Sequence, residues 1–516
     1  MSFSLKTLKS GFAFCGRILY NISIKFTAAY ISNGRYEMKS VIEDVFKRLK
    51  NGGASYSDIR IINMTEEGVA TNNVKVDNYN ISTDEGFRIR VFYNGAMGFA
   101  SSNIVNENEI RRVADFAFSI AKASALTVDK PAKLAPCDPV KDKYATHIEI
   151  DPFKVSLDEK LGLLFDCEDL MRTVKGVSLT KGFLKFWKTD KKFYSSDGAD
   201  IEQTIYESGG GIECYSIANG DFQKRSFPNS FRGNYGTAGY EYIKKLGLKE
   251  NSERIARECA ALIDAPQMPS GLATLIIGGS QLGLQVHESC GHAVELDRVL
   301  GLEASYAGTS FLTLDKRGTF KYGSKIVNLV ADGTIPGGLG SFKYDDEGVP
   351  AQRIEIVKDG IFMNYLSSRD TAACLNEASN GTARADGWAR IPIVRMTNIN
   401  LEPGEPSLEE LIADTKDGYF IDTNTSWSID DKRVNFQFGC EIAWEIKDGK
   451  LGKIFKNPTY YGITPEFWGN CDAICNKDHQ VIWGTPNCGK GEPGQVMHVA
   501  HRTSPARFRN VRVGVK

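Results

Sequence analysis

One sequence feature most constrains how this chain of 516 residues can fold. It is a segment with two prolines and a glycine that interrupts regular structure, followed directly by a predicted strand and a predicted helix. This breaker is Pro266-Gln-Met-Pro269-Ser-Gly271, and the apolar run Leu272–Gly278 follows it directly. An uninterrupted apolar run is typical of a strand buried on both faces. The next residues predict a helix with Ser280 as its N-cap. Because a chain of this length exceeds one ordinary core, we place the main domain boundary at the breaker.

Two smaller modules are predicted before this boundary. Residues 38–130 begin with an amphipathic helical pattern and continue with strand-like runs that turn at Asn94-Gly95. A Pro-rich connector over residues 131–139 leads to residues 140–268, where helices alternate with strands. The sequence therefore predicts two α+β modules in the first half of the chain.

Residues 270–516 are predicted to form the third and largest domain. Beyond the first helix its signals are mainly β, with hairpins expected at Asp359-Gly360 and Asp448-Gly449. Short helices are expected at Ser407–Asp414 and Pro465–Cys475. The predicted fold class is thus α+β, with small N-terminal α+β modules followed by a large, mainly antiparallel β domain.

The overall charge balance excludes some classes of partner. The chain has 63 basic and 64 acidic side chains, so we expect neither nucleic acid nor a charged membrane surface as its main partner. No run of 18 apolar residues is present, which argues against a membrane span. The eleven cysteines are irregularly spaced and odd in number, which favours a reducing, cytoplasmic location.

The basic N-terminal extension, residues 1–37, contains no acidic residue within its first 36 positions. It lacks the apolar stretch of a secretory signal and is interpreted either as a transit-type leader or as a start assigned too far upstream. In the second case Met38 is the true start, because the first ordinary helix begins there.

Two of the six histidines, His287 and His292, lie five residues apart in the helix predicted after Ser280, and Glu288 follows the first directly. Neutral imidazole is a good zinc ligand, and a Glu beside a metal can take a proton from water whose pKa the metal lowers to about 7. The pattern therefore indicates metal-assisted hydrolysis. The alternative is a pair of histidines that find hydrogen-bond partners within or beside a helix.

The spacing differs from the His-Glu-x-x-His pattern, in which the histidines are four residues apart. In an α-helix, side chains five residues apart point about 140° from each other. One π-type turn, with its hydrogen bond between residues i and i+5, would return both histidines to one face. Gly291, directly before His292, would tolerate this distortion, so we predict a π-type turn there.

The run Val286–Glu295 resembles the His-Glu-x-x-x-His signature of the TldD/PmbA family of metallopeptidases. Three later segments are similar to the family pattern and occur in the same order. They are Asp332–Pro336 continuing to Asp345–Gly348, then Arg395–Asn398, and finally Gly484–Gln495. The resemblance runs from about Met38 to Val515 and covers everything except the N-terminal extension.

This resemblance implies that His287, His292 and the downstream Cys488 hold one divalent metal ion and that Glu288 is the general base. Zinc is the default for two histidines and a thiolate, with iron as the alternative. His501, in a further segment similar to the family, is expected to bind substrate. Since the partner type called PmbA or TldE lacks the ligands, the intact set indicates a TldD-type catalytic subunit.

The expected activity is hydrolysis of unfolded or short peptides by metal-activated water, in the C-terminal domain that carries the metal-binding helix. The resemblance also implies that the peptide lies extended, as an added β-strand, in a chamber between subunits. The assembly would be a homodimer or a heterodimer with a PmbA/TldE-type paralogue. The alternative function is a non-catalytic peptide-binding or regulatory subunit of the same architecture.

Other residues offer rival interpretations. Cys471, Cys475 and His479 would line one face of a helix and could bind a metal, although buried Cys is common. Cys290 could be a ligand, a redox-sensitive thiol or a packed side chain. Cys488 could be a nucleophile with a His base, but this would leave Glu288 and the paired histidines without a role. The acidic run Asp345–Gly348 is interpreted as a solvated turn, with a hard-cation site as one alternative and, from its similarity to the family, a structural or subunit-contact role as another.

Overall fold

A computed structural model describes residues 38–306, 308–491 and 494–514, so the extension 1–37 lies outside the described residues. The described residues form two compact units. The smaller comprises those up to Ile59 together with Gly86–Pro131 and Tyr194–Gly198. The larger comprises Arg60–Glu85, Ala132–Phe193 and those from Ala199 onwards. No described helix is long and apolar enough to cross a membrane.

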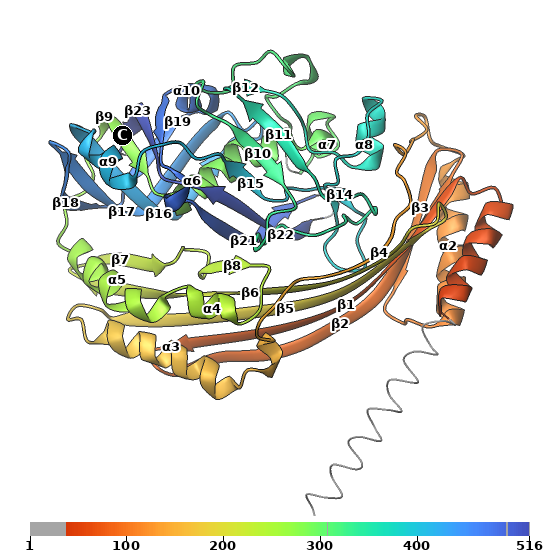
Figure 1. The fold of residues 1–516 in the computed structure, drawn as a ribbon, viewed down its shortest axis with the longest axis horizontal. Coiled ribbons are helices and arrows are strands. Elements are labelled where there is room, and N and C mark those ends of the chain that lie inside the picture. The colour runs from red at the N-terminus through yellow and green to blue at the C-terminus, as the bar shows by residue number, and fades with distance from the viewer. Residues whose placement is uncertain (1–37, 307, 492–493, 515–516) are drawn as a thin grey trace, which may run out of the picture. The chain divides into compact units, whose positions relative to one another are not determined.

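Eight strands from the first half of the chain form one sheet in the order β3-β2-β1-β5-β6-β4, with β7 and β8 also paired to β6 (Figure 1). Both stretches predicted as N-terminal modules contribute strands to this sheet. The strands are β1 (Tyr56–Asn72), β2 (Val76–Tyr93), β3 (Ala96–Ser102), β4 (Lys141–Ala145), β5 (Leu179–Ser195), β6 (Asp200–Ala218), β7 (Asp221–Phe227) and β8 (Asn234–Gly236).

The smaller unit contains a helix over residues 38–51 and helix α2 (Glu107–Ser124). The side chain of Asn106 caps α2 by accepting a hydrogen bond from the backbone N–H of Glu109 at 2.9 Å. α2 packs so closely on β3 that a Cβ at Gly98 would lie 1.9 Å from the carbonyl oxygen of Ala117. Only glycine permits this approach.

The larger unit carries α3 (Leu157–Arg172), α4 (Glu241–Lys245) and α5 (Leu248–Leu262) beside the long strands. Leu164 and Met171 of α3 and Ile255 of α5 pack with Phe186 and Ile212 of the sheet in one buried apolar cluster. A short 3-10 turn, Pro152–Lys154, precedes α3. This core fixes α3 and α5 against β5 and β6.

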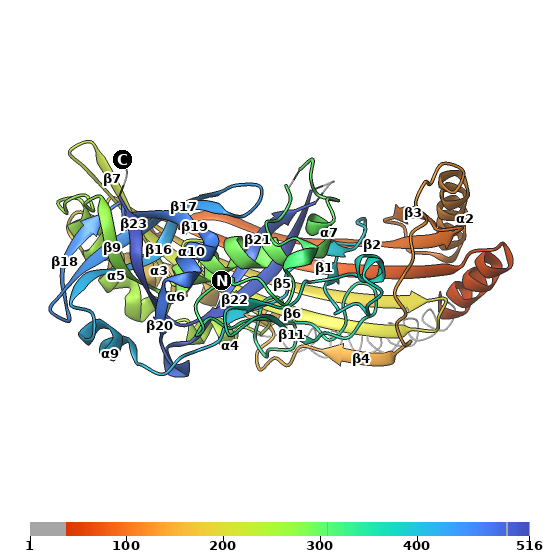
Figure 2. The same ribbon diagram turned by 90° about the horizontal axis from the view of Figure 1, so that it is seen from above.

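The C-terminal half has its own seven-stranded sheet, in the order β16-β9-β23-β19-β17-β18 with β20 on β23 (Figure 2). Among its described pairings only β9–β16 is parallel. The strands are β9 (Gly271–Ile277), β16 (Asp417–Ile429), β17 (Asn435–Lys447), β18 (Lys450–Lys456), β19 (Thr459–Ile463), β20 (Cys471–Ile474) and β23 (Ala506–Val513). A mixed α+β fold with mainly antiparallel sheets is thereby confirmed.

Smaller elements surround this sheet. The remaining strands form three small sheets with the orders β12-β11-β10-β15, β13-β14 and β21-β22. Their bounds are β10 (Leu329–Asp332), β11 (Arg353–Lys358), β12 (Ile361–Phe362), β13 (Ala383–Arg384), β14 (Ile393–Val394), β15 (Ile399–Leu401), β21 (Val481–Lys490) and β22 (Gln495–Thr503). The helices are α6 (Gly279–Val286), α7 (Leu296–Val299), α8 (Arg369–Cys374), α9 (Leu408–Ala413) and α10 (Thr464–Gly469), and 3-10 turns lie at His292–Val294, Leu314–Lys316 and Lys477–His479.

The predicted hairpin turns are confirmed at all three positions. Asn94-Gly95, Asp359-Gly360 and Asp448-Gly449 each have positive φ at both residues and connect β2 to β3, β11 to β12 and β17 to β18. This backbone matches the twist of the flanking strands, and Asn or Asp followed by Gly adopts it at the lowest cost.

Two local predictions were wrong. The helix expected over Pro465–Cys475 ends at Gly469, and Cys471–Ile474 is strand β20, because these residues pair with β23. Ser280 does not cap α6. The N-cap is Gly278, and the Ser280 hydroxyl donates instead to Asp422 Oδ1 at 2.8 Å. In both cases a tertiary partner outweighs the local preference.

A π-helical turn over His287–Gly291 continues α6, as the histidine spacing predicted. The backbone N–H of His292 donates to the carbonyl oxygen of His287, which is the i to i+5 bond of a π turn. Strand β9 enters the core between β16 and β23, and the chain passes directly from it into α6. The two histidines are therefore presented by a buried and rigid segment.

Gly291 serves this turn in a different way from the one expected. Its φ of −52° and ψ of −57° are ordinary for any residue, so conformational freedom is not the reason for glycine here. A Cβ would instead lie 2.1 Å from the sulfur of Met396, a fully buried side chain. The turn thus needs glycine for space.

We expect Gly291→Ala to lower the free energy of unfolding by about 1–3 kcal/mol, because the added methyl group overpacks the site against Met396. Chemical denaturation would measure this. Gly283→Ala in the preceding helix is the control. Its Cβ would meet its nearest neighbours at 3.5 Å, and it should be neutral or stabilising by up to about 1 kcal/mol. Equal unfolding free energies for the two variants would contradict the packing explanation.

Candidate metal centre

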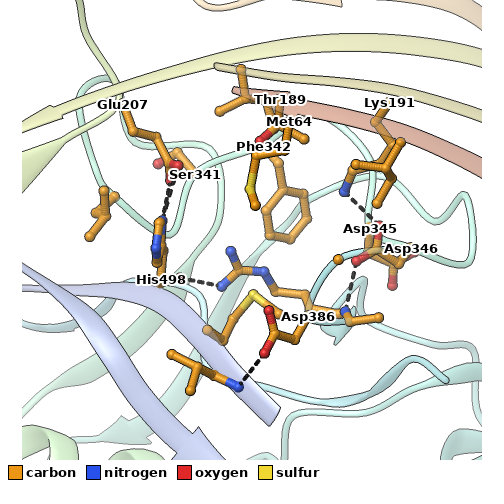
Figure 3. A pocket seen from close by; sticks show the side chains of 18 of the residues that line it. Met64, Thr189, Lys191, Glu207, Ser341, Phe342, Asp345, Asp346, Asp386 and His498 are labelled. Atoms are coloured by element: carbon orange, nitrogen blue, oxygen red, sulfur yellow. Dashed lines mark hydrogen bonds and ion pairs between the residues drawn. The ribbon is translucent and has the colours of Figure 1, made fainter. Parts of the chain in front are cut away.

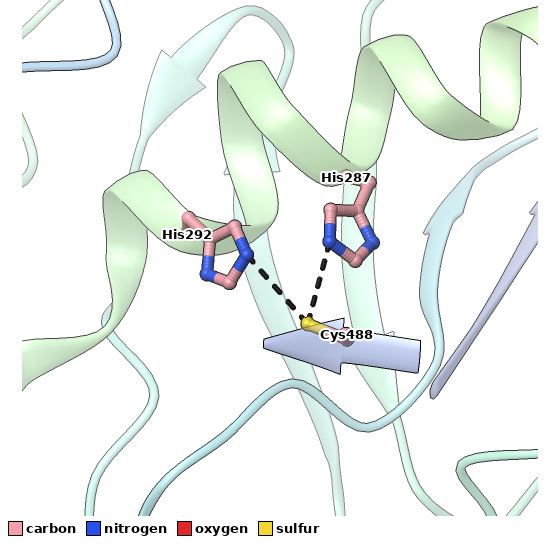
Figure 4. Close-up of side chains that lie close together, drawn as sticks. All are labelled: His287, His292 and Cys488. Atoms are coloured by element: carbon pink, nitrogen blue, oxygen red, sulfur yellow. Dashed lines mark hydrogen bonds between the residues drawn. The ribbon is translucent and has the colours of Figure 1, made fainter. Parts of the chain in front are cut away.

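Three buried side chains from two distant parts of the chain converge beside the π-helical turn (Figure 4). His287 begins this turn, His292 follows it, and Cys488 lies on β21. The Cys488 sulfur is 3.4 Å from His287 Nε2 and 3.6 Å from His292 Nε2. The three candidate ligand atoms all lie within 4.8 Å of one another.

The two sulfur–nitrogen distances fit a tetrahedral metal ion. With metal–sulfur and metal–nitrogen bonds of about 2.3 and 2.0–2.1 Å, a tetrahedral zinc separates its sulfur and nitrogen ligands by about 3.5 Å. Two imidazoles and one thiolate would leave the fourth coordination position of the metal open for water or substrate. This is the arrangement of a catalytic zinc site. Their mixture of nitrogen and soft sulfur donors suits zinc or iron better than calcium or magnesium.

The charges around Cys488 favour its thiolate form. Burial alone would raise the pKa of this thiol, but the charges of His287 and Arg395 bring the pKa well below its usual range. Burial lowers the pKa of His292 far below its usual value, which keeps the ring neutral. The pKa of His287 rises despite burial, because the ring faces the Cys488 sulfur. Metal binds to a thiolate and to neutral imidazoles, so binding would displace the proton that the raised pKa of His287 favours.

His501 determines which nitrogen of His287 faces the sulfur. His501 Nδ1 donates to the carbonyl oxygen of Ile399 at 3.1 Å, so the Nε2 of the neutral ring is an acceptor. Burial lowers the pKa of His501 well below its usual value, in keeping with a neutral ring. The His287 Nδ1 lies 2.7 Å from that Nε2 and donates to it. The Nε2 of His287 therefore faces Cys488 without a proton, as a metal ligand would require.

This position of His501 differs from the substrate-binding role expected for it. Its side chain is buried behind His287 and does not line the cavity at the metal centre. We therefore propose for His501 a role in supporting a metal ligand.

Glu295 supports the second histidine in the same manner. Its Oε2 accepts from His292 Nδ1 at 2.9 Å, which leaves His292 Nε2 facing Cys488. The ammonium group of Lys490 lies 3.3 Å from the same carboxylate oxygen and donates to Asp297 Oδ1 at 2.7 Å. Lys490 is only two residues from Cys488, so it links the strand that carries the sulfur to the segment that carries the histidines.

Arg395 fixes the backbone of the strand that carries Cys488. This fully buried side chain donates to the carbonyl oxygens of Cys488 and, at 3.0 Å, Gln495, on the two strands of the β21–β22 hairpin. The pairing of the hairpin shifts register between Thr485 and Cys488. The sulfur is therefore placed by an irregular strand whose backbone is fixed by hydrogen bonds.

A cavity of about 410 Å³ opens onto the metal centre. It is lined by the three candidate ligands and by Phe231, Leu284, Glu288, Trp427, Ser428, Ile429, Arg433, Thr485, Asn487 and Gly489. Glu288, expected to be the general base, is thus at the same cavity as the ligands. Its Oε2 accepts from Arg433 Nη1 at 2.6 Å. The cavity has a polar side at the metal centre and an apolar side around Trp427, which packs edge-on against Phe231.

Two rival interpretations are weakened by the structure. Cys471 lies on strand β20, so Cys471, Cys475 and His479 do not share a helical face, and no metal-binding group of described residues includes them. Cys290 lies within the π turn but packs in the apolar core. Burial raises the pKa of its thiol to about 12, which makes it a poor ligand or redox thiol.

The acidic run Asp345–Gly348 is not the solvated turn that was expected. Asp345, Asp346 and Glu347 are all buried, and Asp345 accepts hydrogen bonds from the backbone N–H groups of Val349 and Ala383. Burial, followed by the charge of Glu347, raises the pKa of Asp345 to about 8. The run connects neighbouring loops within the larger unit.

A second cavity, of about 120 Å³, lies beside this run (Figure 3). Its charged side chains already have partners within the protein. Lys191 Nζ is 2.5 Å from Asp346 Oδ1, and His498 Nδ1 is 3.0 Å from both carboxylate oxygens of Glu207. The larger cavity at the metal centre is therefore the better candidate for a functional site.

Sequence reasoning missed Glu295, Lys490 and Arg433. The first two stand close to the ligands in sequence, three residues after His292 and two after Cys488. A charged residue at such a position is a usable signal, because metal-bound histidines commonly donate to a carboxylate. Arg433 lies in a hairpin turn far from both motifs, and nothing in its sequence context indicates the pairing with Glu288.

Two segments of the chain match models of known domains. Residues 270–514 match the PmbA/TldA metallopeptidase C-terminal domain, and residues 57–121 match the PmbA/TldA metallopeptidase domain 1. The crystal structure of TldE from Thermococcus kodakarensis has the same fold, with a TM-score of 0.73 over 92% of this chain and 100% of that chain at 16% identity.

Relatives in other organisms are similar along nearly their whole length. A metalloprotease of Methanocaldococcus jannaschii is 31% identical over 453 residues, which cover 87% of this chain and 95% of the relative. A zinc metalloprotease TldD homologue of Saccharolobus solfataricus is 23% identical over 480 residues, which cover 91% and 99% of the two chains. Together with the two matching domains, these similarities show that the chain belongs to the PmbA/TldA metallopeptidase family.

Proposed function

We propose that this protein is a metal-dependent peptidase, with the metal held by His287, His292 and Cys488 and with Glu288 as general base. One observation carries the proposal: three potential ligands and one carboxylate from separate parts of the fold meet at a single cavity. The names of the relatives support a metal, and that of the Saccharolobus solfataricus homologue supports zinc. Iron is the alternative that the same ligand types accept.

A divalent metal at this site would polarise the carbonyl oxygen of a peptide and lower the pKa of water beside it. The role of Glu288 is to move protons. It takes one proton from the attacking water, whose oxygen forms a bond to the carbonyl carbon. It then gives that proton to the leaving nitrogen as the carbon–nitrogen bond breaks. The products are a carboxylic acid and an amine, with no other reactant.

The cavity suits an extended peptide. Its volume of about 410 Å³ has room for a few residues, and its apolar side, including Trp427 and Ile429, would receive apolar side chains. Asn487 and Gly489 are exposed on either side of Cys488. We propose that an unfolded or short peptide adds as a strand beside these residues.

A dimer, either with a second copy or with a TldE-type paralogue, remains our proposal for the assembly, because TldE has the same fold. The cytoplasm remains the proposed location. All ten described cysteines are free, as expected in a reducing compartment. The second candidate function is a non-catalytic peptide-binding subunit, which would need neither Glu288 nor a bound metal.

Replacing Glu288 separates the two functions. Glu288→Gln keeps the shape of the side chain but cannot accept the proton, so we expect kcat/KM for a cleaved peptide to fall about 10²–10⁴-fold with metal content unchanged. Mass spectrometry of the products and metal analysis of the protein would measure both. A fully active variant would refute this role. A wild type that binds metal and peptide but cleaves nothing would favour the second function.

Cys488→Ser should strongly reduce the metal content of the purified protein, because a serine hydroxyl replaces the thiolate. Elemental analysis by mass spectrometry would show it. Cys290→Ala is the matched control, since Cys290 is buried near the same turn but has no ligand role, and this variant should retain metal. Equal metal content in the Cys488 variant and wild type would remove Cys488 from the ligand set.

Glu295→Gln should weaken metal binding about 10–100-fold, because His292 loses the carboxylate that orients its ring. Competition with a chelator would give the metal dissociation constant. Glu409→Gln is the control. Glu409 also pairs with a histidine, His479 at 3.5 Å, but on the surface and away from the metal centre. An unchanged metal affinity in Glu295→Gln would contradict the supporting role.

A further inference from the structure

Arg433 occupies a backbone conformation that costs energy for an arginine. It lies in the turn between β16 and β17 with a φ of +66°. A side chain in this left-handed region costs about 1–2 kcal/mol, and most other described non-glycine residues at positive φ are Asn or Asp. A strained residue at a cavity points to a function for its side chain.

The turn that carries Arg433 is held firmly. Asp430 accepts hydrogen bonds from the backbone N–H groups of Val434 at 2.7 Å and Asn435 at 3.0 Å. The hydroxyl of Thr464 donates to the carbonyl oxygen of Arg433 at 2.8 Å. The backbone is therefore fixed around Arg433, and its guanidinium group is delivered to the cavity from a rigid base.

Within the cavity, Arg433 uses only part of its guanidinium group. Nη1 donates to Glu288 Oε2 at 2.6 Å; the guanidinium makes no other hydrogen bond to a described residue, and its Nε is buried without a partner. Arg433 lines the cavity and its side chain keeps 15% of its surface exposed. A planar guanidinium can engage two acceptors at once, so a molecule in the cavity can take the second position.

We infer that Arg433 is a second catalytic residue, which donates a hydrogen bond to the oxygen of the scissile carbonyl as negative charge develops on it. This inference rests on the proposed peptidase function. When Glu288 takes a proton it loses its negative charge, and the carbonyl oxygen gains one. A guanidinium beside both groups stabilises the charge in either place, and it cannot itself be deprotonated.

The surroundings of the pair strengthen this effect. Phe231, Leu284 and Trp427 form apolar parts of the cavity wall, and the side chain of Glu288 is only 9% exposed. Charge–charge and charge-assisted hydrogen bonds are stronger where water is excluded. Glu288 therefore interacts with Arg433 in two ways. Before the reaction its carboxylate positions the guanidinium group. During the reaction Glu288 takes a proton and loses its negative charge, which leaves the positive charge of Arg433 to stabilise the carbonyl oxygen.

Three variants test this inference. Arg433→Gly removes the side chain at a position where glycine adopts the backbone more easily, and this relief of backbone strain offsets the loss of the ion pair with Glu288. Arg433→Lys keeps the charge but loses the planar fork. Lys432→Ala is the matched control, because it removes a positive charge from the adjacent exposed residue of the same turn.

The first measurement uses a peptide that the wild type cleaves. We expect Arg433→Gly to lower kcat about 10²-fold while KM stays within about threefold, since the lost hydrogen bond forms only in the transition state. Arg433→Lys should recover part of kcat, and Lys432→Ala should match the wild type. Metal content should be the same in all four proteins. An unchanged kcat in Arg433→Gly would overturn the inference.

The second measurement is binding, by calorimetry, of the phosphonamidate analogue of that peptide. The analogue carries its negative oxygen where charge develops, so Arg433→Gly should weaken its binding about 10²-fold and leave that of an uncleaved peptide unchanged. The same loss is expected when Arg433→Gly is added to Glu288→Gln. If the loss disappears in that double variant, Arg433 acts only through Glu288 and the inference fails.

These outcomes keep the two proposals distinguishable. A wild type that cleaves peptides while Arg433→Gly behaves identically refutes the role of Arg433 alone. A wild type that binds metal and cleaves no peptide refutes the peptidase, and the role of Arg433 with it.

Discussion

The hydrogen bond from the backbone N–H of His292 to the carbonyl oxygen of His287 is the constraint on which the candidate metal centre depends. It makes a π turn out of what would otherwise be α-helix, and so brings side chains five residues apart onto one face. The turn survives because Gly291 leaves room for Met396. The turn lies between α6, which follows the core strand β9, and the 3-10 turn His292–Val294.

Burying these ligands requires many compensating contacts. An isolated charge inside a protein is costly, so each buried group at the centre has a partner. His501 and Glu295 each hold the Nδ1 of one histidine, while Lys490 and Arg395 hold the strand of Cys488. Both rings therefore present Nε2 to the sulfur. The supporting residues come from several segments, so the arrangement requires all of these segments to be in place together.

Two of the motif segments recognised along the chain, Asp332–Pro336 and Arg395–Asn398, contact each other. Asn398 donates to the carbonyl oxygen of Asp332 at 2.6 Å and accepts from the backbone N–H of Gly340 at 2.9 Å. The neighbouring residue, Ile399, accepts the hydrogen bond of His501. Segments that carry no ligand thus position the residue behind His287. The left-handed backbone of Arg433 lowers stability at the same site. This is consistent with a side chain whose role is chemical and not structural.

The sequence by itself determined the elements whose signals are local. The mixed α+β class, the hairpin turns at Asn94-Gly95, Asp359-Gly360 and Asp448-Gly449, and the π turn follow from spacing and from turn chemistry within a few residues. Resemblance to a family added Cys488 as a candidate ligand. Only the tertiary structure decided the single sheet shared by the two N-terminal modules, the strand at Cys471–Ile474 and the place of His501 behind His287. It also decided the burial of the acidic run and the pairing of Arg433 with Glu288. Each of these depends on a contact between residues far apart in the chain, and no local pattern encodes which distant partner a strand or a charged side chain will meet.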